Sequence, residues 1–275
     1  MDPYFFPNQS PDIMRLDERF RAQVARLDEA ARLELYAILS AIGPTFTPTT
    51  FSHEDGLTVA HQADRRLHFP SPTPVKVLSH ILCGYEEWLR RKYCLPGFVE
   101  VEPDDVVIDC GAYVAGFSLS AARLAKAVHV FEPDRVNYAC VTRNFAGVAH
   151  VHLNHAGLYS VSGRMPLNVS SSSVEHSLLP PDDGEVVEVR EIQVLALADY
   201  CRDHELATPD FVKIEAEGVE LEVFEGLGEL RPRKLAIDVS PERNNESPAA
   251  AFHSLLADLG YETRQRAHVL FARTP

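Results

Sequence analysis

The stretch VVIDCGAYVAGF, residues Val106–Phe117, decides the fold that we expect for this chain. Its first residues, Val106 to Ile108, are β-branched and uninterrupted, which is typical of a parallel strand covered on both faces. Gly111 has no Cβ and allows the sharp turn that must come before a helix. The helix expected over residues 118–126 has one apolar face, and a second apolar run, Val128–Phe131, follows it. The pattern predicts a β-α-β unit.

The turn and the end of the second strand predict a ligand that contains a nucleoside. A glycine such as Gly111 lets a ligand approach the main chain, and the N–H groups at a helix start favour an anionic group. Glu132 follows the second strand, where a carboxylate can accept hydrogen bonds from two ribose hydroxyls. Its place past the strand end predicts that Glu132→Ala weakens cofactor binding and changes stability little. A helix-capping role for Glu132 predicts the reverse.

Two nucleoside cofactors, NAD and S-adenosylmethionine, compete for this turn. The dinucleotide fingerprint G-x-G-x-x-G does not fit the turn DCGAYVAG, residues Asp109–Gly116. Asp109 is poorly placed for a pyrophosphate, but it suits a ligand whose methionine end carries an ammonium group. The residues therefore favour S-adenosylmethionine.

Three motifs, in order along the chain, resemble one known family. They are VVIDCGAYVAGFSL, VHVFEPD and DFVKIEAEGVELEVFEGL, and they resemble the FkbM-type S-adenosylmethionine-dependent methyltransferases over about Val101 to Arg273. The resemblance implies an α/β fold with a Rossmann-like class I methyltransferase sheet, mostly parallel with an antiparallel last strand. It also implies methyl transfer to a hydroxyl of a sugar, glycolipid or polyketide-type natural product.

The chain departs from the family pattern at three positions. Ala115 aligns with the last glycine of the family's first motif, Glu215 replaces the family's aspartate, and Ser240 stands where a histidine is often seen. The departures leave room for a scaffold protein that binds S-adenosylmethionine without catalysis. An NAD-dependent oxidoreductase is a third possibility.

Composition excludes several classes of partner. A hydrophobic content of 45% with 24% charged residues is that of an ordinary globular protein. The formal net charge of −14 repels phosphate backbones and anionic membranes, so we expect no nucleic acid partner. The five cysteines form no C-x-x-C pair, and no leader or membrane span is recognisable. A cytoplasmic location is expected.

The first hundred residues predict a mainly helical extension. Ser10-Pro11-Asp12 is a helix start, and apolar residues then recur at helical spacing from Ile13 to Ile42. This single long helix could form a homodimer contact or pack on its own domain. An extended connector over residues 44–52, a hairpin over 57–69 and a helix that begins at Thr73-Pro74 follow. We expect residues 1–100 to form a lid or dimer contact, and residues 101–275 to form the S-adenosylmethionine-binding domain.

The second domain should contain three more core strands and an insertion. Strands are expected over residues 150–153, 211–214 and 235–237, and a final hairpin over 261–272 supplies the antiparallel strands. Residues 164–197 read as an inserted hairpin with a flexible loop. In the resembling family such an insertion borders the acceptor site, which implies that His176 and Ser177 face substrate. His155, past the third strand, could contact adenine or lie in a surface turn.

Carboxylates at three strand ends suggest the catalytic chemistry. Asp109, Glu215 and Asp238 should meet at one edge of the sheet, where repulsion and burial can raise a pKa enough for one of them to act as a base. Alternatively, they cap helices or pair with Lys213, Arg231 or Arg243. Carboxylates are also ligands that Mg²⁺ prefers, but we expect no essential metal. The catalytic candidates are Glu215, Asp238, Lys213 and His176. The candidates for cofactor binding are Asp109, Gly111, Ala112, Tyr113, Gly116, Glu132, Pro133, His155 and Glu215.

Overall fold

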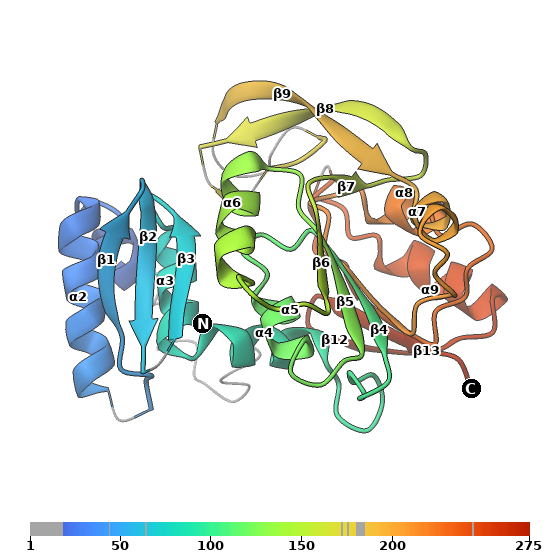
Figure 1. Ribbon diagram of the computed structural model, residues 1–275, viewed down its shortest axis with the longest axis horizontal. Helices are drawn as coiled ribbons and strands as arrows, with labels where there is room; N and C mark the ends of the chain where they lie inside the picture. The colour runs from blue at the N-terminus through green and yellow to red at the C-terminus, as the bar shows by residue number, and fades with distance from the viewer. Residues whose placement is uncertain are drawn as a thin grey trace. The chain divides into compact units, whose positions relative to one another are not determined.

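The computed structural model describes residues 19–275 except 44, 64, 172, 175, 180–184 and 244. Its contacts divide the chain into two units, the residues up to Lys92 and Tyr93–Pro275 (Figure 1). The predicted helix start at Ser10-Pro11-Asp12 lies outside the described residues. No helix within the described ranges is long and apolar enough to cross a membrane.

The N-terminal unit breaks the long helix that the sequence predicts. Residues 19–24 are helical, the chain leaves the helix at residues 25–28, and α2 (Glu29–Ile42) then begins. Asp28 caps α2, because its Oδ1 accepts a hydrogen bond of 2.8 Å from the Ala31 N–H. The prediction of one unbroken helix is therefore wrong, and a residue that favours caps marks the break.

The unit also contains more strand than expected. The predicted hairpin is confirmed as β2 (Leu57–Gln62) and β3 (Arg65–Pro70), which pair antiparallel. The predicted connector contains a third strand, β1 (Thr50–Glu54), paired antiparallel with β2. The helix predicted after Thr73 is two helices, α3 (Val75–Leu82) and α4 (Tyr85–Tyr93). Gly84 separates them with a φ of +77°, which a continuous helix excludes.

A seven-stranded sheet in the order β12-β13-β11-β10-β4-β5-β6 forms the second unit. β4 pairs parallel with β5 and β10, whereas β13 runs antiparallel to β11 and β12. The expected Rossmann-like sheet with a reversed last strand is confirmed. Its strands are β4 (Val106–Cys110), β5 (Ala127–Phe131), β6 (Val151–Asn154), β10 (Phe211–Ile214), β11 (Lys234–Asp238), β12 (Glu262–Arg266) and β13 (Val269–Arg273).

Helices cover both faces of this sheet (Figure 1). One face carries α5 (Gly116–Ala121), shorter than the predicted helix, and α6 (Arg135–Asn144). The other carries α7 (Leu197–Asp203), α8 (Glu220–Glu225) and α9 (Ala249–Asp258). Apolar side chains of these three helices pack on the central strands in one buried cluster that includes Ile108, Val212 and Phe252. Burial on both faces explains why the strands are apolar without alternation.

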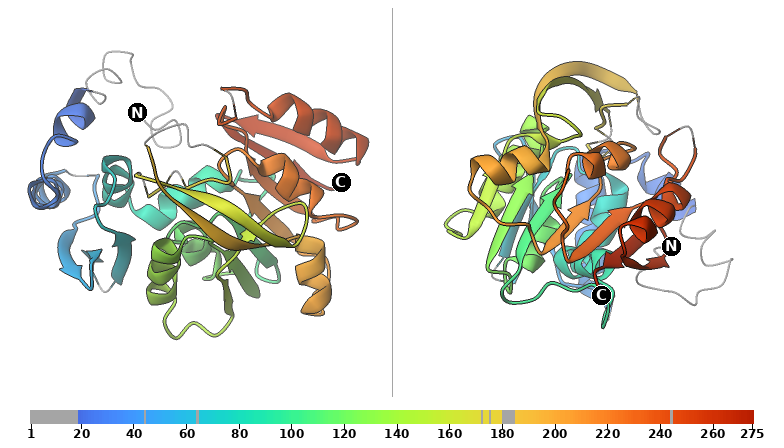
Figure 2. Two further views of the ribbon diagram at one scale, coloured as in Figure 1. Left: turned by 90° about the horizontal axis from the view of Figure 1, so that it is seen from above. Right: turned by 90° about the vertical axis from the view of Figure 1, so that its right-hand side faces the viewer.

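The predicted insertion is confirmed as a hairpin. β8 (Gly163–Ser170) pairs antiparallel with β9 (Val186–Leu195), and the short β7 (Gly157–Leu158) pairs parallel with β9. The hairpin crosses above the sheet in Figure 1 and is again at the top in the right-hand view of Figure 2. It lies on the side where the loops that follow β4, β5 and β10 are found, because its side chains contact those loops.

Candidate functional site

The turn after β4 is held by the neighbouring strands. Gly111 has a φ of +70°, and a Cβ at this position would lie 1.7 Å from the Glu215 carbonyl oxygen. The N–H groups of Gly111 and Ala112 donate to the Phe131 carbonyl at 3.2 and 3.1 Å. From the sequence alone, Gly111 is explained by the approach of a ligand. That explanation is incomplete, because the main chain of Glu215, just after β10, already leaves no room for a Cβ at this position. The N–H groups of Gly111 and Ala112 are engaged by β5, and the prediction for the N–H groups at the helix start stays a prediction.

Two residues of the same loop adopt the left-handed conformation without being glycine. Tyr113 has a φ of 54° and Ala115 a φ of 63°. Ala115 is buried and immediately precedes Gly116, the first residue of α5. A side chain in this conformation costs about 1 kcal/mol, so the alanine at the family's glycine position adds strain to the loop.

Glu132 lies at the junction of this turn with α6. Its Oε2 accepts a hydrogen bond of 2.8 Å from the Tyr113 N–H, and its Oε1 accepts one of 2.9 Å from the Asp134 N–H. Asn137 Nδ2 lies 3.4 Å from Oε1. Burial raises the pKa of Glu132 to about 8, although the backbone hydrogen bonds oppose this shift. Because the side chain is only 4% exposed, the expectation that Glu132 stands outside the core is wrong.

Lys213 lies between two of the three predicted carboxylates. Its Nζ is 3.0 Å from Asp109 Oδ1 and 3.1 Å from Glu215 Oε2, and it donates to the Gly111 carbonyl at 2.6 Å. Asp109 Oδ2 accepts a hydrogen bond of 2.6 Å from Ser118 Oγ. The predicted repulsion between Asp109 and Glu215 is therefore absent, and the alternative, pairing with Lys213, is the arrangement found. Asp109 Oδ2 is thus hydrogen-bonded, whereas Oδ1 is paired with the Lys213 ammonium but accepts no hydrogen bond within the described part of the chain.

The electrostatics fix the charge of Lys213. Burial lowers its pKa, but the charges of Asp109 and Glu215 outweigh burial and hold the pKa above its usual value. The ammonium is thus permanently charged at neutral pH. Of the two carboxylates, Asp109 is fully buried, whereas the Glu215 side chain is 25% exposed. Glu215 is therefore the member of this trio that a ligand can reach.

The third carboxylate, Asp238, is the last residue of β11, which pairs parallel with β10. Its Oδ1 accepts a hydrogen bond of 2.9 Å from the Ser240 N–H. Next to it, Glu220 Oε1 accepts from the N–H groups of Ala216 and Gly218 at 2.8 and 3.2 Å, which shapes the loop after β10. Burial raises the pKa of Glu220 to about 7, and the charge of Asp238 adds to the increase.

The two histidines predicted for the site differ in their surroundings. His176 Nδ1 accepts a hydrogen bond of 3.0 Å from the Ser170 N–H, so the neutral ring carries its proton on Nε2. Burial lowers the pKa of His176, which favours this neutral form. His155 is exposed and stacks on Tyr138, with 4.6 Å between ring centroids. His155 therefore lies at the surface, and its predicted contact with adenine stays a prediction.

Several residues near the site were missed in the sequence. Glu220 could have been found, because it lies within the third motif that carries the family resemblance. Asn137 and Ser173 carry no local signal, since their importance comes from contacts with distant loops. Ser177 was expected to face substrate, and its Oγ donates a hydrogen bond of 2.6 Å to the Glu217 carbonyl. The remaining predicted residue, Pro133, lies beside Gly157 of β7.

The described residues contain no group of three or more His, Cys, Asp or Glu that could hold a metal ion. The expectation of a reaction without an essential metal stays a prediction.

A family model described as the methyltransferase FkbM domain matches residues 109–263, from the Asp109 turn into β12. The chain belongs to the FkbM methyltransferase family. It is a methyltransferase, and the resemblance seen in the sequence motifs is confirmed.

Known relatives of this FkbM chain include the methyltransferase sdnD of Sordaria araneosa. That protein is 26% identical over 196 residues, which cover 58% of this chain and 75% of the relative. Among solved structures, the methyltransferase FkbM from Methylobacillus flagellatus KT has 20% identity and a TM-score of 0.48. The match covers 71% of this chain but only 52% of that protein. A precorrin-6y C5,15-methyltransferase from Geobacter metallireducens GS-15 has 13% identity, a TM-score of 0.43 and coverages of 74% and 93%.

Proposed function

We propose that this FkbM-family chain transfers the methyl group of S-adenosylmethionine to a hydroxyl of a sugar, glycolipid or polyketide-type natural product. The observation that carries the cofactor assignment is the position of Glu132. Its carboxylate follows β5 and contacts the turn after β4, at the carboxyl ends of adjacent parallel strands. Open α/β sheets bind nucleoside ligands at such ends, where an acidic residue accepts the ribose hydroxyls.

In this proposal S-adenosylmethionine supplies the methyl group, and the chain must align the acceptor and remove its hydroxyl proton. Glu215 is the best candidate for the base, because it is partly exposed at the rim of the sheet. Lys213 is the wrong residue for that task, since its ammonium stays protonated between two carboxylates. Its role is to fix the orientation of Glu215. His176, with its proton on Nε2, can donate a hydrogen bond to an acceptor oxygen.

The cofactor assignment is tested by calorimetric titration of the full chain with S-adenosylhomocysteine and, separately, with NAD. We expect the first to bind and NAD to give no heat. Glu132→Ala should weaken binding tenfold to a few hundredfold, because about 1.5–3 kcal/mol is lost for each of two charge-assisted hydrogen bonds and water that enters the gap recovers part of that loss. Binding of NAD alone would instead support the oxidoreductase alternative.

The reaction is tested by methyl transfer from S-adenosylmethionine to a panel of glycosides and polyketide hydroxyls. Glu215→Gln should lower kcat by about a hundredfold to ten-thousandfold, the usual contribution of a positioned base. Glu225→Gln, a matched change at the end of α8, is the control. Binding without turnover on any acceptor would support the scaffold alternative.

Three further expectations remain proposals. The N-terminal unit acts as a lid or as a homodimer contact, the protein works in the cytoplasm, and the reaction needs no metal. Activity that is lost in EDTA and restored by Mg²⁺ would contradict the last of these.

A further inference from the structure

One segment of the inserted hairpin contacts the loops after two different core strands. We define the strap as the described residues of 173–179, which follow β8. At one end of the strap, Ser173 Oγ lies 3.2 Å from the Tyr113 hydroxyl in the loop after β4. The Ser173 carbonyl accepts a hydrogen bond of 3.2 Å from Asn137 Nδ2 on α6, the helix after β5.

The other end of the strap holds the loop after β10. Ser177 is buried, and its Oγ donates a hydrogen bond of 2.6 Å to the Glu217 carbonyl. Glu217 has a φ of 49°, a conformation that a side chain disfavours and that needs support from its surroundings. Leu179 packs beside Gly218, so the strap covers this loop as well as bonding to it.

The strap is itself anchored to its own hairpin. The main chain of Ser177 exchanges hydrogen bonds of 2.8 and 3.2 Å with Asn168 of β8, and Asn168 Nδ2 donates to the Leu179 carbonyl. A third tie comes from β9, where Arg190 Nη1 lies 2.8 Å from Asp134 Oδ2. The hairpin is therefore attached to the loops after β4, β5 and β10, which carry Tyr113, Glu132 and Glu215.

The tie through Asn137 leaves one buried polar atom unsatisfied. Asn137 is 4% exposed, and its Oδ1 has no hydrogen-bond partner in the described part of the chain. Buried acceptors are rarely left unpaired, and each one costs stability. A ligand hydroxyl or amino group is a chemical complement for an acceptor beside Glu132.

We propose that the strap positions the cofactor loops, with Ser173 and Ser177 as positioning residues and Asn137 as a second recognition residue for the nucleoside. This proposal rests on the proposed function and adds to it the residues that set cofactor affinity. The hydroxyls of Ser173 and Tyr113 form a hydrogen bond with each other, so removal of either hydroxyl breaks the same hydrogen bond between the strap and the loop after β4. The cofactor loops then spend part of their time out of the binding arrangement, and affinity falls.

The experiment is calorimetric titration of the full chain with S-adenosylhomocysteine. Ser173→Ala and Tyr113→Phe should each weaken binding about threefold to tenfold, the usual effect of one hydrogen bond, and the double variant should be no weaker than the singles. Ser173→Thr keeps the hydroxyl and should retain the wild-type affinity. Ser171→Ala is the matched control, because among the described residues its Oγ accepts a hydrogen bond of 3.1 Å from the Glu185 N–H of the same hairpin.

The outcomes separate this proposal from the proposed function. A wild-type chain that fails to bind S-adenosylhomocysteine overturns both. A wild-type chain that binds, together with a Ser173→Ala variant of equal affinity, overturns the strap alone. Tighter binding by Ser173→Ala also overturns it, because the strap would then obstruct the site. Melting temperatures without ligand should differ little among the Ser171 and Ser173 variants, so that a general loss of stability does not explain weaker binding.

Discussion

Lys213 occupies the position beside Asp109 that the sequence predicts for the ammonium of the cofactor. Its charge satisfies Asp109 and Glu215 together, at 3.0 and 3.1 Å. A buried ion pair that is also hydrogen-bonded offsets the cost of desolvation, whereas either charge alone in this place would be strongly destabilising. At the scale of the residue, the acidic turn motif therefore has a structural role that is independent of any ligand.

Gly111→Ala should destabilise the protein even without cofactor. The new Cβ would lie 1.7 Å from the Glu215 carbonyl, so a strand or the turn must move. Gly97→Ala is the matched control, because Gly97 also has a positive φ of +69° but nothing within 4 Å of the added atom. We expect Gly111→Ala to lose about 1–3 kcal/mol more than Gly97→Ala in urea unfolding. Equal losses would contradict the proposed clash. The bulkier substitution Gly111→Arg should prevent the protein from folding, because its Cβ meets the same carbonyl.

Cofactor affinity should depend on pH through Glu132. Burial in the folded, ligand-free protein raises the pKa of this carboxyl from its ordinary value of 4.5 to about 8. Its contribution to stability is therefore present below about pH 4.5 and falls as the pH rises toward 8. Ribose hydroxyls donate to the ionised form, so binding should release a proton.

The measurement is S-adenosylhomocysteine affinity between pH 6 and pH 8, where each pH unit should tighten binding by up to about tenfold. Titrations in buffers of different ionisation enthalpy report the released proton directly. Glu132→Gln should remove the pH dependence. An affinity that is constant across this range, or equally steep in the variant, would show that another group is responsible.

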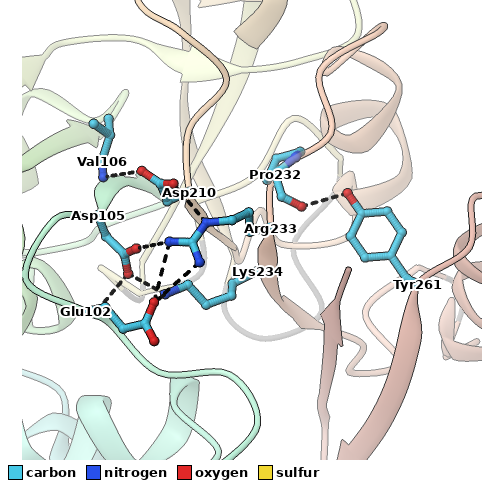
Figure 3. Close-up of polar contacts among 8 residues, drawn as sticks. All are labelled: Glu102, Asp105, Val106, Asp210, Pro232, Arg233, Lys234 and Tyr261. Atoms are coloured by element: carbon cyan, nitrogen blue, oxygen red, sulfur yellow. Dashed lines mark hydrogen bonds and ion pairs between the residues drawn. The ribbon is translucent and has the colours of Figure 1, made fainter. Parts of the chain in front are cut away.

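At the scale of the element, the strands are held at their amino-terminal edge by a second group of charges (Figure 3). Lys234, the first residue of β11, lies 2.6 Å from Asp105 Oδ2, and Arg233 Nη2 lies 2.9 Å from Asp105 Oδ1. Arg233 also contacts Asp210, which accepts a hydrogen bond of 2.9 Å from the Val106 N–H of β4. This group joins the starts of β4, β10 and β11, opposite to the candidate site.

Lys234→Met should therefore be strongly destabilising. It leaves the fully buried Asp105 with only one cationic partner, Arg233, and removal of one member of a buried pair typically costs about 3–5 kcal/mol. Lys126→Met removes an exposed lysine from the same end of the sheet and should change stability by about 0.5 kcal/mol or less. Urea unfolding at pH 7 compares the two. A Lys234→Met variant as stable as the control would show that the cluster does not hold the strands together.

Two helix boundaries are marked by a capping residue and by a glycine, and the spacing of the apolar residues does not show either of them. Asp28 caps a new helix, and Gly84 turns the chain between α3 and α4. The apolar spacing continues across both breaks. Capping and glycine signals therefore outweigh periodicity at those positions.

At the scale of the whole molecule, cofactor binding should be visible as local protection rather than a uniform change. S-adenosylhomocysteine at a hundred times its dissociation constant should stabilise the folded state by about 2.7 kcal/mol. Hydrogen exchange should slow at the loops that contain Gly111, Glu132 and Glu217, and in the strap. The strands β12 and β13, at the far edge of the sheet from β5, are the internal reference. Protection confined to those strands would place the site elsewhere.

Patterns within the sequence specify the β-α-β unit, the reversed last strand, the inserted hairpin and the family. Each of these depends on periodicity or on motifs within a short stretch, such as the apolar run before Asp109 and the alternation in residues 164–197. Local propensity and burial pattern specify such features without knowledge of what lies across the fold.

The construction of the candidate site depends on contacts between residues that are distant in the sequence. Lys213 neutralises Asp109 across about a hundred residues of sequence, the Glu215 carbonyl requires Gly111, and Ser173 reaches Tyr113 from a hairpin that no motif links to it. These contacts depend on strand register and on the path of an insertion. The physical reason is that the charge, burial and hydrogen bonding of a side chain are set by its neighbours in space, which local sequence patterns do not specify.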